Sequence, residues 1–329
     1  MKQKTLFELQ KKLQELISPS PLQSINHPLF TNKGINVSVK RDDLLHTYIS
    51  GNKWRKLKFN LIDARKRGIS HLISFGGAYS NHIHALAAAG FYFGFKTTAI
   101  IRGEPHYAQN STLQQAQQWG MQLHFVTRKE YRQRADPKYI NQLQLKFPNA
   151  IIVPEGGSNA LAIEGVSELC HEISAQANNR VDHVITATGS GGTLAGLIAG
   201  FSAIPANHRP TITGVAVLKE AQYLKQQVSS LLEQADRRIR LPWQLQTEFH
   251  GGGYAKVSHE LNDFCQTFEQ QVNIPIEPIY TGKMFHALFE LIKQDHFTPG
   301  DNIIALHTGG LQGLKGLKAR NDSYNSAIK

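Results

Sequence analysis

The stretch SGNKWRKLKFN (residues 50–60) places Lys53 directly after a Gly-Asn pair and just before an apolar pattern with helical spacing. Lys56 lies one helical turn further on, so both amines can face one site. A lone lysine is usually a solvated surface charge. A lysine that is held still can instead attack a carbonyl carbon and form an imine. The other turns of the chain decide between these two interpretations.

A glycine-rich turn, TATGSGGTLAG (residues 186–196), follows an apolar, strand-like run. Its glycines let the backbone approach a ligand, and a helix N-terminus follows, which predicts a phosphate cradle rather than a merely flexible turn. The turn lacks the Gly-Lys-Ser/Thr ending of a P-loop and the spacing of the dinucleotide fingerprint. The predicted cradle consists of Thr188, Gly189, Ser190, Gly191, Gly192 and Thr193.

A second turn, FGGAYSNHIHALAAAG (residues 75–90), places Ser80, Asn81 and His82 where an apolar helix begins. Taken alone, Ser80 or Asn81 is best interpreted as a helix N-cap. His82 and His84 are two residues apart and lie on different helix faces, so we expect no metal site here.

Two later turns carry tyrosine and threonine. IYTGKM contains Tyr280 and Thr281, ALHTGG contains Thr308, and FHGGGYAK places Tyr254 after three glycines. Buried tyrosines are often core residues with a satisfied hydroxyl, but near a substrate they can act as acid–base groups. In combination, the lysine, the cradle, Asn81 and the threonine turns suit pyridoxal phosphate, whose aldehyde needs an amine and whose phosphate needs the glycine turn.

The composition sets the class of protein. The chain has 329 residues, is 41% hydrophobic, and carries a net charge of +11. Its basic residues are dispersed, so we expect no nucleic-acid partner and favour solvated helix faces. Two distant cysteines indicate a reducing compartment, and no run is apolar and long enough for a membrane span. We therefore expect a soluble, cytoplasmic protein that acts on a small molecule.

Strand-like apolar runs alternate with helix-length amphipathic segments, which predicts an α/β fold with parallel-rich sheets flanked by helices. About two sheets of four strands each are expected. The predicted strands are 35–40, 71–77, 97–102, 122–127, 150–154, 182–188, 211–217 and 302–308. Ligands bind at the carboxyl ends of such strands, which is where the turns above lie.

Six motifs occur in order: VKRDDLL…GNKWRKL, GGAYSNHIHALAAAG, EGGSNALAIEG, TGSGGTLAGL, YTGK and HTGG. In these motifs, over residues 36–315, the chain resembles the 1-aminocyclopropane-1-carboxylate deaminase and D-cysteine desulfhydrase family of pyridoxal-phosphate enzymes. The resemblance implies the two-domain tryptophan-synthase-β-like fold (fold type II). A small domain (53–166) would be inserted into a large cofactor-binding domain (1–52 plus 167–329). It also implies a homodimer.

The resemblance further implies roles for the cofactor-binding residues. Lys53 looks like the Schiff-base lysine and the acid–base group at the substrate carbon. Asn81 would donate a hydrogen bond to the 3′-oxygen of the cofactor, and Lys56 with the 188–193 turn would bind its phosphate.

The substrate side follows from the same comparison of motifs. Ser80 resembles the hydroxyl residue beside the substrate, with Asn81 and His82 near the substrate carboxylate. Tyr254 and Tyr280 resemble the two active-site tyrosines.

Three positions favour the desulfhydrase side of the family: Thr281, Thr308 and His82, where the deaminases carry Glu, Leu and Gln. Thr281 resembles the partner of the pyridine nitrogen. A hydroxyl there leaves the ring a weaker electron sink than a carboxylate would, which is adequate for eliminating a good leaving group. The chain departs from the family in the 200–250 stretch and at Ala255, where a glycine often follows the tyrosine.

We therefore expect a pyridoxal-phosphate lyase that eliminates hydrosulfide from D-cysteine to give pyruvate and ammonia. The alternatives are a 1-aminocyclopropane-1-carboxylate deaminase, or a desulfhydrase or dehydratase with another small amino acid as substrate. A pyridoxal-phosphate-binding paralogue without turnover is the non-enzyme alternative, and a nucleic-acid binder ranks below it.

Overall fold

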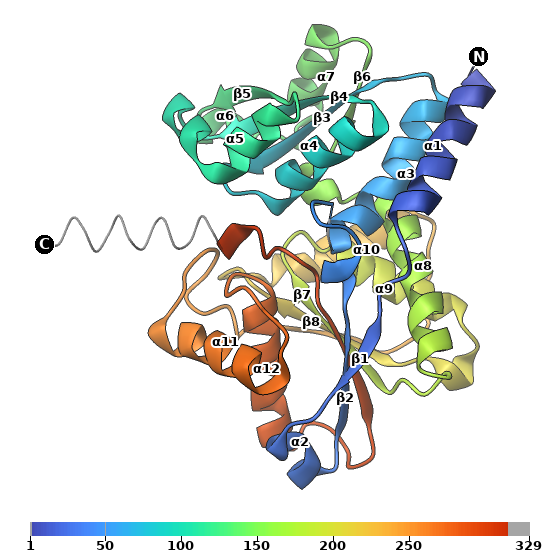
Figure 1. Cartoon of the computed structure of the whole chain (residues 1–329), viewed down its shortest axis with the longest axis vertical. Coiled ribbons are helices and arrows are strands. Elements are labelled where there is room, and N and C mark those ends of the chain that lie inside the picture. Colours follow the sequence, from blue (N-terminus) through green and yellow to red (C-terminus); the bar gives the residue numbers. More distant parts are fainter. Residues whose placement is uncertain (1, 50, 315–329) are drawn as a thin grey trace, which may run out of the picture.

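The computed structural model describes residues 2–49 and 51–314, which form two sheets with helices packed around them (Figure 1). The larger sheet has six strands in the order β1-β2-β10-β7-β8-β9, and the smaller has four in the order β5-β4-β3-β6. In Figure 1 the smaller sheet lies above the larger, and the long helices α1 and α3 run side by side next to it. The sheets are therefore separate layers joined by helices.

The strands of the larger sheet come from both ends of the chain and run parallel except at one edge. Only β1 pairs antiparallel, with β2; every other neighbouring pair is parallel. These strands are β1 (Leu22–Ile25), β2 (Asn36–Lys40), β7 (His183–Thr188), β8 (Thr211–Ala216), β9 (Trp243–Gln246) and β10 (Asn302–Leu306).

The smaller sheet is entirely parallel and comes from one continuous part of the chain. Its strands are β3 (His71–Gly77), β4 (Lys96–Arg102), β5 (Gln122–Val126) and β6 (Ala150–Val153). All of them lie inside the predicted insertion 53–166, whose limits stay a prediction. Because parallel strands share one direction, the carboxyl ends of the strands lie at the same end of each sheet.

Helices connect and cover these strands. α3 packs on α8 and α1, and α8 in turn packs on α9, so one helical layer links the two sheets. The helices are α1 (Lys2–Leu16), α2 (Pro28–Lys33), α3 (Asn52–Lys66), α4 (Asn81–Phe93), α5 (Ser111–Gln118), α6 (Arg128–Tyr131), α7 (Pro137–Lys146), α8 (Ala160–Gln176), α9 (Gly192–Ala203), α10 (Tyr223–Gln234), α11 (His259–Val272) and α12 (Thr281–Lys293).

All eight predicted strands are present, but the expectation of about four strands in each sheet was wrong for the larger one. Its two additional strands, β1 and β9, are short edge strands of the sequences LQSI and WQLQ. Each has too few residues to show a clear alternation, so pairing with a neighbour decides their conformation. Helix α7 was also missed, although Asp136 caps it and Pro137 begins it, which is a recognisable start signal.

The VKRDDLL motif supplies a buried charge network that fixes α3. Arg55 donates to Asp42 (Nη2 to Oδ1, 3.0 Å) and to Glu172 on α8 (Nη1 to Oε1, 2.5 Å). Lys40, fully buried, donates to the same Glu172 at 3.0 Å. The arginine and lysine hold the pKa of Glu172 below its usual value despite burial, which by itself would raise it. The network thus ties β2, α3 and α8 together directly behind Lys53.

No helix in the described part of the chain is long and apolar enough to cross a membrane.

Replacing Arg55 by Met removes the guanidinium group that binds both Asp42 and Glu172. Breaking a buried pair strands an uncompensated charge, so Arg55→Met is expected to lower the free energy of unfolding by about 3–5 kcal/mol. Urea unfolding followed by circular dichroism measures it. The matched control is Arg67→Met at the end of the same helix, where the pair with Asp63 is exposed and is worth about 0.2–1 kcal/mol. Equal losses in the two variants would contradict this role of the network.

Candidate active site

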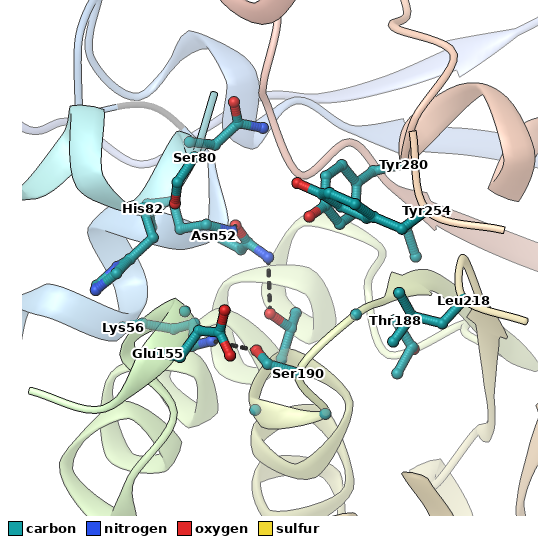
Figure 2. A pocket seen from close by; sticks show the side chains of 18 of the residues that line it. Asn52, Lys56, Ser80, His82, Glu155, Thr188, Ser190, Leu218, Tyr254 and Tyr280 are labelled. Atoms are coloured by element: carbon teal, nitrogen blue, oxygen red, sulfur yellow. Dashed lines mark hydrogen bonds between the residues drawn. The ribbon is translucent and has the colours of Figure 1, made fainter. Parts of the chain in front are cut away.

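A cavity of about 340 Å³ opens where the carboxyl ends of both sheets face each other (Figure 2). Strand β7 of the larger sheet ends at Thr188, and β3 and β4 of the smaller end at Gly77 and Arg102; all three residues line the cavity. Ligands of parallel sheets usually bind at the carboxyl ends of the strands.

Most predicted site residues line this cavity. They are Lys53, Lys56, Ser80, Asn81, His82, Thr188, Gly189, Ser190, Gly191, Gly192, Thr193, Tyr254 and Tyr280. Thr281 and Thr308 do not line it, and both are buried.

Lys53 lies in the first turn of α3. Two residues before it, at Gly51, the backbone leaves no room for a side chain. Gly51 has φ +66°, and a Cβ there would lie 1.9 Å from the carbonyl oxygen of Thr308. The Asn52 backbone N–H donates to that same carbonyl at 3.3 Å, and its side chain donates to Thr193 Oγ1 at 2.8 Å (Figure 2). Gly51 and Asn52 therefore join the start of α3 to the last turn of the larger sheet and to the cradle.

The Lys53 amine is prepared to react as a nucleophile. Its Nζ donates to Asn52 Oδ1 at 2.6 Å. Burial disfavours the ammonium form and lowers the pKa of Lys53 to about 8, against the opposing charge of Glu277. A sizeable fraction of this amine is thus neutral near pH 8, unlike that of a surface lysine.

The glycine turn forms a cradle at the start of α9. Gly191 caps the helix with φ +74° and without a side-chain hydrogen bond. A Cβ at Gly192 would lie 2.6 Å from Ser158 Oγ and 3.0 Å from Lys56 Nζ, so a side chain there would displace both groups from the cradle. The first N–H groups of a helix have no intrahelical acceptor and favour an anion.

Lys56 completes the cradle from the side. Its Nζ donates to Ser158 Oγ at 2.7 Å and to Ser190 Oγ at 3.3 Å, and these two hydroxyls lie 2.8 Å apart. Burial, and then the charge of Lys53, lower the pKa of Lys56 well below its usual value. No carboxylate in the described part of the chain pairs with Lys56, so a bound phosphate is the group that would restore its charge.

The Ser80–His82 turn faces the cradle from the smaller sheet. Ser80 Oγ accepts the Ile83 backbone N–H at 3.3 Å, so it does cap α4, and it also lines the cavity. Asn81 Oδ1 accepts from Gln312 at 2.9 Å, which links this turn to the segment after β10. Capping and ligand binding are thus compatible roles for one turn.

His82 is buried and neutral. Its Nε2 lies 2.8 Å from Ser74 Oγ, and within the described residues its Nδ1 has no partner. Burial, followed by the charges of Lys56 and Lys53, lowers its pKa well below the usual value. The Nδ1 edge of the ring packs against Gly157, where a Cβ would lie only 3.3 Å from Nδ1, so His82 fixes the position of the Gly156–Gly157 turn.

The two tyrosines lie on the opposite side of the cavity, with ring centroids 6.0 Å apart (Figure 2). Desolvation raises the pKa of both phenols, well above the usual value for the half-buried Tyr280 and less for Tyr254, which is 43% exposed, so both are neutral. Lys283 of the YTGK motif positions the Tyr254 turn, because its Nζ donates to the Gly253 carbonyl at 2.7 Å. Ala255 has φ +55°, which explains why glycine suits that position.

Thr281 is fully buried against a carboxylate that sequence reasoning missed. Its hydroxyl lies 3.1 Å from Glu277 Oε1, and Glu277 also accepts the backbone N–H groups of Ile279, Tyr280 and Thr281. Burial raises the pKa of Glu277 to about 7, although these hydrogen bonds oppose the shift. Glu277 lies outside α12, three residues before the N-cap residue Tyr280, yet it accepts the first backbone N–H groups of the helix.

Among the residues not predicted are Asn52 and Glu155, which line the cavity, and Ser158, which contacts Lys56 of the cradle. Asn52 adjoins Lys53 in sequence, Ser158 follows Gly-Gly in the EGGSN motif, and Glu155 begins that motif. The signal for Ser158 was present, because a hydroxyl after a strand–Gly-Gly turn repeats the form of the cradle. Only the fold brings it to Lys56, 102 residues away.

The comparisons with known proteins agree with this geometry. The chain matches the family model described as "Pyridoxal-phosphate dependent enzyme" over residues 13–309. It is 29% identical over 318 residues to a D-cysteine desulfhydrase of Klebsiella pneumoniae (strain 342), covering 92% of this chain and 95% of that protein. It is also 29% identical over 316 residues to the mitochondrial bifunctional D-cysteine desulfhydrase/1-aminocyclopropane-1-carboxylate deaminase of Arabidopsis thaliana, covering 90% and 77%.

A solved structure described as an "ACC deaminase homologue" superposes with a TM-score of 0.79 at 26% identity, covering 94% of this chain and 95% of that one. The predicted tryptophan-synthase-β-like fold is therefore confirmed. With its cradle, its buried amines and its match over nearly the whole length, the chain belongs to the pyridoxal-phosphate dependent enzyme family.

Proposed function

We propose that this pyridoxal-phosphate enzyme is a lyase that eliminates hydrosulfide from D-cysteine, giving pyruvate and ammonia. The observation that carries the proposal is that one cavity contains a buried amine of lowered pKa, an anion cradle and two neutral phenols. The choice of D-cysteine rests on Thr281, Thr308 and His82, which resemble the desulfhydrases, and on the similarity to the Klebsiella protein.

The residues fit the cofactor. The cradle glycines, Ser190 and Lys56 offer a phosphate-sized anion site, and Lys53 offers an amine to an aldehyde. The bound cofactor would withdraw electrons from the substrate α-carbon, which acidifies the proton there.

The protein side chains then bind, orient and move protons. Ser80 and Asn81 offer polar groups for the substrate carboxylate, and His82 lines the same side of the cavity. The Lys53 amine, when neutral, accepts the α-proton at its Nζ. Tyr254 and Tyr280 supply phenol protons on the other side of the cavity, where the sulfur leaves.

The second candidate is a 1-aminocyclopropane-1-carboxylate deaminase. It is favoured by the similarity of the fold to the ACC deaminase homologue and by the printed name of the bifunctional Arabidopsis relative. The two activities share the amine and the cradle, so product analysis separates them.

The test uses purified enzyme loaded with the cofactor. D-cysteine, L-cysteine and 1-aminocyclopropane-1-carboxylate are supplied separately, and sulfide, pyruvate and 2-oxobutanoate are assayed. Sulfide and pyruvate from D-cysteine support the proposal. Formation of 2-oxobutanoate from the ring substrate without sulfide from either cysteine supports the deaminase. If none of the three compounds gives a product, both candidates are contradicted.

Replacing Lys53 by Ala is expected to abolish turnover and the covalent link to the cofactor. The measurement is visible absorbance of the loaded protein before and after borohydride, with pyruvate formation as the second readout. Lys58→Ala on the same helix is the control, since its amine is paired with Glu168 outside the cavity. Borohydride-sensitive absorbance that persists in Lys53→Ala would exclude Lys53 as the linking residue.

The attachment of the cofactor to protein stripped of it should depend on pH through Lys53. Only the neutral amine attacks, so the rate is expected to rise about tenfold per pH unit below the pKa and to level off near pH 8. Absorbance after mixing measures it. A rate that still rises steeply between pH 9 and 10 would show that the Lys53 pKa is not lowered.

Introducing the deaminase residues tests the specificity positions. Thr281→Glu with Thr308→Leu is expected to raise the ratio of 2-oxobutanoate to sulfide production. Because Thr281 is buried against Glu277, the new carboxylate should also destabilise the protein through like-charge repulsion. The variant Glu277→Gln in the same background is expected to recover that stability. An unchanged product ratio in a folded double variant would contradict the assignment of these positions.

A further inference from the structure

Four arginines gather beside the cavity at the edge of the smaller sheet. A second cavity of about 940 Å³ is lined by Arg102, Arg128, Arg132 and Arg134, and we name it the arginine annex. Arg102, Arg134 and Gly77 line both cavities, so the annex adjoins the site that contains Lys53. No step of the proposed function uses these cations.

The carboxylates near the annex do not neutralise Arg102. Glu155 accepts from Arg134 Nε and from the Tyr131 hydroxyl, both at 2.5 Å, so its charge is already matched. Glu104 lies 3.4 Å from His106. Within the described residues, Arg102 has no ion pair and no side-chain hydrogen bond, and its guanidinium lies 5.5 Å from the centre of the Tyr131 ring. Arg128 and Arg132 have no ion pair in the described residues either, so three solvent-exposed guanidinium groups, with Arg102 nearest the first cavity, are available to a ligand.

Arg102 is placed beside the position of a substrate. A Cβ at Gly77 would lie 3.7 Å from Arg102 Nη2, and Gly77 begins the turn that ends with Ser80. Tyr254 lines the same cavity as Arg102. A molecule whose α-carbon lies at Lys53 can extend a substituent toward Arg102.

We propose that the arginine annex binds a negatively charged end of the substrate β-substituent, so that the enzyme prefers β-substituted alanines with a second anionic group. This inference rests on the proposed lyase function. For S-carboxymethylcysteine the Cα–H proton goes to Lys53, the Cβ–S electron pair leaves with sulfur, and one water is consumed. The products are pyruvate, ammonium and mercaptoacetate, which balances all atoms.

The experiment compares two isosteric substrates that differ in charge. S-carboxymethylcysteine and S-carbamoylmethylcysteine, each as D- and L-isomer, are supplied to the loaded enzyme, and pyruvate is assayed. We expect kcat/KM to be about 2- to 5-fold higher for the carboxylate, the range for an ion pair with an exposed arginine. Arg102→Gln is expected to bring the ratio of the two substrates close to one.

Two variants control for structural damage. Arg102→Lys keeps the charge and should retain part of the preference, and Arg67→Gln, far from the cavity, should keep all of it. Equal kcat/KM for the two substrates in the unchanged enzyme, or an equal preference in Arg102→Gln, would overturn the inference.

A binding measurement separates this inference from the lyase proposal. Each compound is titrated into the loaded enzyme while the cofactor absorbance is followed, which gives dissociation constants without turnover. If S-carboxymethylcysteine binds more tightly through Arg102 but gives no pyruvate, the role of the arginine annex is supported and the lyase proposal is contradicted. Pyruvate formed from both compounds with equal affinities would support the lyase and refute the annex.

Discussion

The active site depends on two lysine amines one helical turn apart, the half-buried Lys53 and the fully buried Lys56, neither of which forms an ion pair with a carboxylate in the described residues. Burial lowers the pKa of both Lys53 and Lys56, and Lys56 is further affected by the charge of Lys53. Such a pair destabilises the empty site, since each charge is poorly solvated. A phosphate bound at the cradle would compensate the charge of Lys56, and an aldehyde that reacts with Lys53 would remove the second charge. The cofactor therefore stabilises the site when it binds. The lowered pKa of Lys53 also makes its amine a nucleophile.

The rest of the fold holds these amines in place. Arg55 lies between them in sequence, and its buried network with Asp42 and Glu172 fixes α3 to β2 and α8. At the start of the helix, Gly51 and Asn52 join it to the last turn of the larger sheet and to the cradle. These contacts hold the start of α3 on two sides and so fix where the Lys53 side chain begins.

Glu277 changes how Thr281 is understood. The motif comparison treated Thr281 as a hydroxyl facing the cofactor ring, whereas its hydroxyl here is engaged with a buried carboxyl group whose pKa is raised to about 7. That group also caps the start of α12 and so sets the position of Tyr280. Its charge favours the ammonium form of Lys53. One buried carboxyl therefore couples a tyrosine, a threonine and the reactive amine.

The sequence by itself determined the α/β class, all eight principal strands, the cofactor and the turns that carry the site, because each depends on local patterns such as strand–Gly-Gly–helix. Only the tertiary structure decided the edge strands β1 and β9, the contact of Ser158 with Lys56, the carboxyl of Glu277 beside Thr281, and the unmatched charge of Arg102. These depend on which residues far apart in the chain become neighbours. Local periodicity carries no information about that, whereas the packing of the two sheets around the helices α3, α8 and α9 fixes it.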